Sequence, residues 1–125
     1  MKPNELRIGN KVNYKDENHE FEVIEIDTLG MRVKDNEQET WIEYECFEAI
    51  PLTKERLIKF GFYKDKFELK LKINDLLFFY SKSFENVMMT SNNDLGGYNH
   101  IRGVKYVHQL QNLYFALTGK ELTIN

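Results

Sequence analysis

The chain has few of the residues that build disulfide-linked or membrane-spanning proteins. Its 125 residues include one cysteine, Cys46. A single cysteine excludes an intrachain disulfide and is typical of a reducing compartment, so we expect a cytoplasmic protein. The longest unbroken apolar run, LLFFY at 76–80, is too short to span a bilayer. The opening segment MKPNELRIGN has no apolar run behind its charges and is not expected to act as a signal peptide.

The sequence also lacks the spacings that mark catalytic or metal sites. His19, His100 and His108 lie on three separate segments without a second ligand at zinc spacing. Gly119 and Lys120 lack the upstream glycine of a phosphate-binding loop and follow a helical pattern, whereas the glycines of such a loop precede the helix. No Gly-x-Ser-x-Gly elbow is present. We therefore expect no enzyme, no metal and no cofactor.

One loop contains several side chains that could bind a cation. The segment SNNDLGGYNH (91–100) offers amide, carboxylate and imidazole groups to a cation, although it does not match EF-hand spacing. The simpler interpretation is a mobile connection between a strand and the next element. Whether this loop binds an ion stays open.

Composition and charge predict a folded chain with two parts. Hydrophobic residues make up 42% and aromatic residues 14% of the chain, which is enough for a packed core and argues against disorder. Residues 1–51 contain 6 Lys and Arg against 13 Asp and Glu, a net charge of −7, whereas residues 52–125 carry +4. An acidic front half and a basic back half indicate two lobes with different surfaces.

Short strands separated by polar turns fill residues 1–51. In EFEVIEID (20–27) and TWIEYECFEAI (40–50), aromatic and branched residues alternate with glutamates, as half-buried strands require. The alternation slips by one residue within 20–27, which predicts a β-bulge there. Gly30 is expected to supply a positive φ in a turn. Several short, strongly curved strands predict an SH3-like small β-barrel over residues 1–51.

Trp41 has two possible orientations in this barrel. It lies in opposite phase to Ile42 and Tyr44, so one of the two sets faces outward. An outward Trp41 would line a peptide groove, which requires exposed aromatic residues, and an inward Trp41 would pack beneath the second lobe. RNA binding by this lobe is disfavoured, because phosphate contacts need a basic face.

A helix and a sheet are expected after the barrel. In PLTKERLIKFGF (51–62), Thr53 can cap a short helix and Gly61 can end it in the left-handed conformation. Alternation and turn residues then predict three antiparallel strands, at 66–73, 76–81 and 86–90. The fold class is therefore α+β: the barrel is followed by an α-β-β-β-α lobe over residues 52–125, in which the C-terminal helix covers the meander.

The C-terminal helix is expected over residues 104–118, with Gly119 ending it. Its apolar stripe comprises Tyr106, Val107, Leu110, Leu113, Tyr114 and Leu117. Phe115 lies off this stripe, on an edge that it shares with Val104, His108 and Gln111. Either this edge packs on the barrel lobe or it forms a strip for a binding partner; one off-stripe aromatic commonly marks burial on two sides.

Three segments carry a resemblance to a known family. They are NELRIGNKVNY near the start, PLTKERLIKFGF in the middle and KYVHQLQNLYFALTGKEL near the end. With them the chain resembles a family of small uncharacterised proteins found in bacterial genomes, on prophages and mobile elements, and in phages. The resemblance implies a phage or mobile-element setting, in which small non-enzymatic proteins often modulate host machinery. It implies no catalytic residues.

These observations favour a non-enzymatic protein-interaction module. The sequence contains the strand, helix-cap and turn patterns of a folded domain, whereas the residue spacings of known catalytic and metal sites are missing. The candidate partner-binding residues are Trp41, His108, Gln111 and Phe115. If Trp41 and Phe115 instead belong to the core, replacing either one would strongly lower the melting temperature.

The basic charge of residues 52–125 supports nucleic-acid binding as an alternative. The candidate contacts are Lys64, Lys66, Lys70, Lys72, Lys82, Arg102 and Lys105. Phosphate contacts would give binding a steep salt dependence. A third hypothesis is that the acidic residues 1–51 mimic DNA toward a host nuclease. Edge strands in both lobes offer pairing surfaces between chains, so a homodimer stays open.

Overall fold

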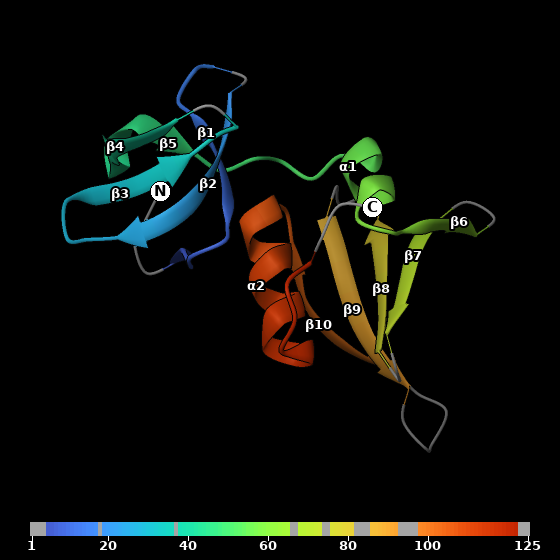
Figure 1. Cartoon of the computed structure of the whole chain (residues 1–125). Helices are drawn as coiled ribbons and strands as arrows, with labels where there is room; N and C mark the ends of the chain where they lie inside the picture. The colour runs from blue at the N-terminus through green and yellow to red at the C-terminus, as the bar shows by residue number, and fades with distance from the viewer. Residues whose placement is uncertain are drawn as a thin grey trace. The chain divides into compact units, whose positions relative to one another are not determined.

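The chain folds into two units, and its C-terminal helix belongs to the first. The N-terminal unit comprises Met1–Pro51 and Tyr106–Glu121, and the central unit comprises Leu52–Lys105 and Leu122–Asn125. The computed structural model describes residues 5–17, 19–36, 38–65, 68–73, 76–81, 86–92 and 98–122. Within these residues each unit has one antiparallel sheet and one α-helix, so the predicted α+β class is confirmed (Figure 1).

The N-terminal unit is built on a curled five-stranded sheet (Figure 1). Its strands are Lys11–Tyr14 (β1), Glu20–Ile26 (β2), Gly30–Lys34 (β3), Glu39–Glu43 (β4) and Phe47–Glu48 (β5). They lie in the order β4-β3-β2-β1-β5, and a 3-10 turn over Tyr44–Cys46 separates the last two strands in sequence. The buried face supplies a core of Leu6, Val12, Phe21, Val23, Met31, Val33, Tyr44 and Phe47. Because alternate residues face opposite sides of a sheet, Arg32 and Lys34 alternate with the core residues of β3 and are exposed.

A β-bulge interrupts β2 where the sequence predicts it. The pair Val23↔Val33 is followed directly by Glu25↔Arg32, so Ile24 has no partner on β3. An extra residue in one strand bends it and increases the local twist. The predicted bulge is therefore confirmed, and it contributes to the curl of the sheet.

Gly30 does not have the positive φ that was predicted for it. Instead, it allows the backbone of β4 to pass close to β3. It is the first residue of β3 and is not among the glycines with positive φ. A Cβ atom on Gly30 would lie 2.5 Å from the carbonyl oxygen of Ile42 and 3.0 Å from the Cα of Glu43. β4 passes directly against this glycine, so any side chain there would push the two strands apart.

The central unit begins with the short helix α1, Lys54–Lys59, which starts and ends as predicted. The Thr53 hydroxyl accepts a hydrogen bond from the backbone N–H of Arg56 at 3.2 Å, and Gly61 adopts a φ of 101° after the last turn. Leu57 is fully buried. These local signals were sufficient because capping depends only on neighbouring residues.

The sheet of the central unit has five strands, which corrects the three-stranded prediction. The strands are Tyr63–Asp65 (β6), Glu68–Ile73 (β7), Leu76–Ser81 (β8), Asn86–Asn92 (β9) and Tyr98–Val104 (β10), in the order β10-β9-β8-β7-β6. The predicted strands correspond to β7, β8 and β9, and β6 and β10 flank them. The sequence of β6, YKD, is too short and polar to show a strand pattern.

The helix α2 spans Val107–Thr118, so it begins three residues later than predicted, and Val104 belongs to β10. Gly119 ends the helix with a φ of 72°, as predicted. The place of α2 in the fold differs from the prediction. Tyr106–Glu121 belongs with the N-terminal sheet, and α2 contacts β1. The proposed lobe of residues 52–125 is therefore corrected: its last helix is part of the other unit.

Candidate functional site

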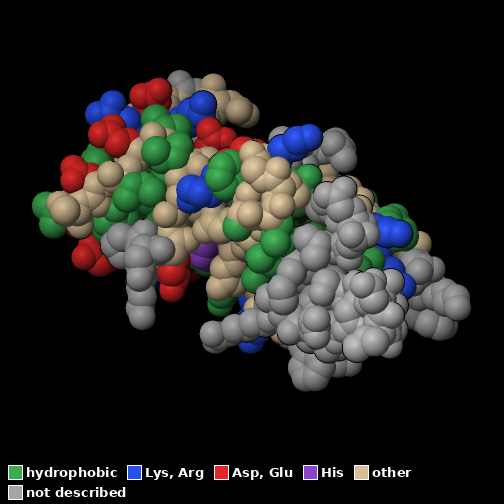
Figure 2. All heavy atoms as spheres, turned by 90° about the horizontal axis from the view of Figure 1, so that it is seen from below, with side chains coloured by type: hydrophobic (Ala, Val, Ile, Leu, Met, Phe, Trp, Pro, Cys, Tyr) green, Lys and Arg blue, Asp and Glu red, His purple; other side chains and the backbone are tan. Residues whose placement is uncertain are grey.

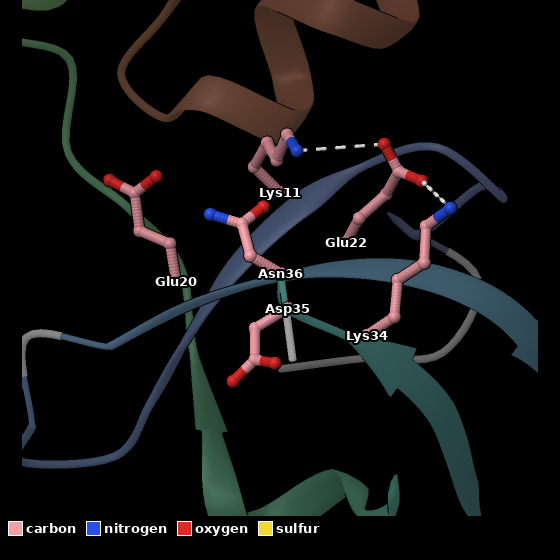
Figure 3. Close-up of a pocket in the computed structure, with 6 residues that line it drawn as sticks. All are labelled: Lys11, Glu20, Glu22, Lys34, Asp35 and Asn36. Atoms are coloured by element: carbon pink, nitrogen blue, oxygen red, sulfur yellow. Dashed lines mark ion pairs between the residues drawn. The ribbon is translucent and has the colours of Figure 1, made fainter. Parts of the chain in front are cut away.

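The outer face of the N-terminal sheet carries oppositely charged side chains in rows. The two carboxylate oxygens of Glu22 lie 3.5 Å from the ammonium groups of Lys11 and Lys34 (Figure 3). Further along, Arg32 pairs with Glu25 at 3.3 Å. Acidic and basic side chains are also interspersed on the face of this unit that Figure 2 shows. Among the described residues this face therefore mixes both charges, and the hypothesis of a DNA mimic stays a prediction.

A shallow hollow of about 390 Å³ lies over these ion pairs (Figure 3). Its lining residues are Lys11, Glu20, Glu22, Lys34, Asp35 and Asn36. Asp35 also contacts His19 Nε2 at 2.9 Å and accepts a hydrogen bond from the backbone N–H of Gln38 at 2.9 Å. Small-molecule sites are mostly apolar with a few polar groups. This hollow has the opposite character, so we do not assign it a ligand.

Trp41 projects from the middle of β4 on the same outer face. It is the only tryptophan of the chain, and its side chain is 44% exposed. Arg32 lies opposite it on β3. Together with Glu39 and Thr40, these residues line a second hollow of about 220 Å³. Tyr44, in the opposite phase, is buried, so of the two orientations left open by the sequence the outward one for Trp41 is observed.

β4 also has a free side, along which no other described strand pairs with it. It is the last strand of the sheet and pairs only with β3 among the described strands. The N–H of Asp35 donates to the carbonyl of Gln38 at 3.1 Å, which identifies the hydrogen-bonded pair that closes the β3–β4 hairpin. Bonded and non-bonded pairs alternate along an antiparallel ladder. Glu39, Trp41 and Glu43 therefore turn their N–H and C=O groups away from β3.

Two of the predicted partner-binding residues on α2 are buried. His108 is 2% exposed and Gln111 is 3% exposed. The Gln111 side chain accepts a hydrogen bond from the N–H of Lys11 at 2.9 Å and donates one to the carbonyl of Gly9 at 3.2 Å. Of the two possibilities left open for this edge of the helix, packing on the barrel is observed at Gln111, which fastens α2 to the start of β1.

The apolar stripe predicted for α2 is only partly buried. Val107 and Leu110 are 1% exposed, but Tyr106 is 37% and Leu117 is 40% exposed. The helical periodicity of the sequence correctly located the apolar side of the helix. However, the polar side chain of Gln111 next to that side makes the hydrogen bonds to the start of β1. Helix periodicity shows where apolar residues gather and does not reveal polar residues that are buried with partners.

A polar network missed by the sequence analysis joins segments near the two ends of the chain. The Asn112 side-chain oxygen accepts hydrogen bonds from Asn10 Nδ2 at 2.8 Å and from Arg7 Nε at 3.2 Å. Arg7 also pairs with Glu121 and lies 4.2 Å from the ring centroid of Phe115, which is 38% exposed. The only sequence signal was that Asn, Gln and Arg gather in both segments, which is equally typical of exposed surfaces.

His108 makes the stability of the N-terminal unit depend on pH. Neither ring nitrogen has a hydrogen-bond partner among the described residues, and the nearest carboxylate oxygen, of Glu5, is 3.9 Å from Nε2. Burial lowers the pKa of His108 below its ordinary value of 6.5, against the opposing effect of Glu5. The folded chain therefore holds this imidazole neutral at a pH where the unfolded chain would protonate it.

Acidification from about pH 7 to about pH 5 is expected to lower the free energy of unfolding, because the unfolded chain binds the His108 proton and the folded chain does not. The contribution is complete above pH 6.5 and falls by at most about 1.4 kcal/mol per pH unit below it. The free energy of unfolding, measured with urea at several pH values in this range, should change less with pH for His108→Gln than for the native chain. His19→Gln, at an exposed position, serves as the control. If His108→Gln leaves the pH dependence of the free energy of unfolding unchanged, His108 is not the source of that dependence.

The lysines proposed for nucleic-acid binding do not share one face of the central sheet. Lys64 pairs across strands with Leu69, which is buried, and cross-strand partners lie on the same face. Lys70 and Lys72 alternate with Leu69 along β7 and so lie on the other face. Lys105 is exposed. Lys66, Lys82 and the side chain of Arg102 lie outside the described residues.

The described residues also bear on metal binding and on membrane insertion. In the described ranges no group of three or more His, Cys, Asp or Glu could hold a metal ion. No helix in that part of the chain is long and apolar enough to cross a membrane. Residues 93–97 of the candidate cation loop lie outside the described residues, as do the side chains of its remaining residues, so ion binding there stays a prediction.

Comparison with known proteins adds no family to these observations. The chain matches no protein-family model, no curated protein and no solved structure. The resemblance to phage and mobile-element proteins therefore stays a prediction.

Proposed function

We propose that the chain is a non-enzymatic protein-interaction module that binds its partner through β4. The surface concerned consists of Glu39, Trp41 and Glu43 and is called the Trp41 edge below. The observation that carries the proposal is the exposed tryptophan at the centre of a strand that forms the edge of the described sheet. Tryptophan is enriched at the centres of protein interfaces, and an open strand edge binds extended peptides by main-chain pairing.

The SH3-like assignment is part of this proposal. It is supported by the strand order β4-β3-β2-β1-β5 and by the 3-10 turn between β4 and β5. Barrels of this kind often bind peptides, although a fold alone does not settle function. The resemblance of the terminal segments adds a phage or mobile-element setting, with a bacterial cytoplasmic protein as the target. A non-enzymatic role is supported by the larger hollow, where the Lys11, Glu22 and Lys34 side chains form ion pairs with one another.

A display selection with random peptides on the immobilised chain tests the proposal. The native chain should enrich a set of peptides, and Trp41→Ala should enrich none above background. Retention of the chain on DNA in a salt-dependent manner, with no peptide enrichment, would instead support the nucleic-acid alternative and contradict the proposal.

Trp41→Ala is expected to change the free energy of unfolding by less than about 1 kcal/mol, because exposed positions outside the core contribute little. The measurement is urea unfolding followed by circular dichroism. A much larger loss would mean that Trp41 is part of the core, and its effect on binding would then reflect unfolding. Phe115→Ala provides a comparison at another exposed aromatic position.

A further inference from the structure

We propose that the Trp41 edge recognises a basic extended peptide segment, which adds a strand beside β4. This inference rests on the proposed function and names the chemical class of the partner.

The edge is acidic even though the sheet behind it is locally neutral. Glu43 lies opposite Gly30, which has no side chain to neutralise it. Glu39 lies opposite Lys34, whose ammonium group is already 3.5 Å from Glu22. Among the described residues neither Glu39 nor Glu43 forms an ion pair, and both are exposed.

One more carboxylate follows β4 directly in the chain. Glu45 lies in the 3-10 turn after β4 and is exposed. A segment that approaches from the free side of β4 therefore meets Glu39 and Glu43, to which no described residue offers an ion-pair partner. Electrostatic complementarity selects basic segments and repels acidic ones.

The spacing of the edge defines a sequence pattern for the partner. Exposure alternates along β4, and Glu39, Trp41 and Glu43 share the outer face. A strand paired beside β4 places every second residue over this face. Lys or Arg at positions i and i+4 would therefore lie beside Glu39 and Glu43, in either strand direction. The residue at i+2 would lie beside Trp41, whose ring favours apolar side chains or a cation.

A second copy of the chain is a poor occupant of the same edge. If two β4 strands paired antiparallel about Trp41, Glu39 of one copy would lie opposite Glu43 of the other. Like charges directly opposite each other destabilise a strand pair. The acidic flanks thus protect the edge from self-association while leaving it open to a basic segment.

Fluorescence titration of the native chain tests this inference, since Trp41 is the only tryptophan. The probe is a short peptide without tryptophan that carries lysines at i and i+4 with valine at i+2 and threonines elsewhere. A second peptide of identical composition places its lysines at i and i+3, so that they lie on opposite faces of a strand. The first peptide should give a saturable change in emission, with an affinity at least about tenfold higher than the second.

Charge reversal provides the matched variants. Glu39→Lys with Glu43→Lys should abolish binding of the lysine peptide and allow binding of its glutamate counterpart. Glu17→Lys with Glu55→Lys makes the same change in net charge at exposed positions that are not part of β4 and should keep the native preference. Equal affinity for the two lysine peptides, or equal losses in both double variants, would overturn the inference in favour of non-specific charge attraction.

The outcomes separate this inference from the proposed function. If peptide display enriches sequences in a Trp41-dependent manner but without alternating basic residues, the interaction module stands and the basic partner is wrong. If neither display nor titration detects binding, both proposals fall.

Discussion

Gln111→Leu is expected to lower the free energy of unfolding by about 2 to 4 kcal/mol. The glutamine amide satisfies the N–H of Lys11 and the carbonyl of Gly9, both at partly buried positions. Leucine fills a similar volume but leaves both backbone groups without a partner, and each unsatisfied buried polar group costs about 1 to 3 kcal/mol. Urea unfolding is the measurement, since it gives the difference between variants directly.

Gln38→Leu is the matched control, because Gln38 is exposed and the chemical change is identical. Its expected effect is within about 0.5 kcal/mol. Similar stability of the two variants would show that α2 is not fastened to β1 through Gln111. The assignment of α2 to the N-terminal unit would then lose its main support.

Met31→Ala is expected to cost about 2 to 5 kcal/mol, the usual range for truncating a large buried side chain. Met31 is 0% exposed and pairs across strands with Ile42 on β4. It lies on the inner face of β3, whereas Trp41 lies on the outer face of the neighbouring strand. Met31→Ala should therefore lower mainly the stability of the chain, whereas Trp41→Ala should abolish peptide binding with little loss of stability.

Met31→Leu, which nearly conserves volume, should cost less than about 1.5 kcal/mol. Melting and urea unfolding of the three variants would compare the two faces of the sheet. If Trp41→Ala proved as destabilising as Met31→Ala, the outer face would have to be treated as core and the binding proposal withdrawn.

Local structure could be predicted from the sequence, whereas the pairing of distant elements could not. The cap at Thr53, the helix end at Gly119 and the bulge in β2 each depend on a few neighbouring residues, and each was predicted. The sheet against which α2 packs depends on contacts with residues about a hundred positions away in the chain. Its apolar stripe would suit either sheet, so the helix was assigned to the nearer one in sequence.

The candidate site could be predicted in part for a related reason. Trp41 stood out as a candidate from composition and phase, but both phases of β4 contain large residues, so its orientation stayed ambiguous. For Gln111 and His108 the sequence left packing on the barrel and a binding strip both open, and the structure shows that the two side chains are buried. The free side of β4 became visible only with the strand order, because nothing within ETWIE distinguishes an edge strand from an inner one.

Amide hydrogen exchange along β4, measured with and without the lysine peptide, tests the central claim most directly. In the free chain the amides of Thr40 and Ile42 should be protected, because they face β3, and those of Glu39, Trp41 and Glu43 should exchange rapidly. The lysine peptide should then slow exchange at these last three amides. Protection of all five amides in the free chain, or no gain in protection with the peptide, would contradict an open binding edge centred on Trp41.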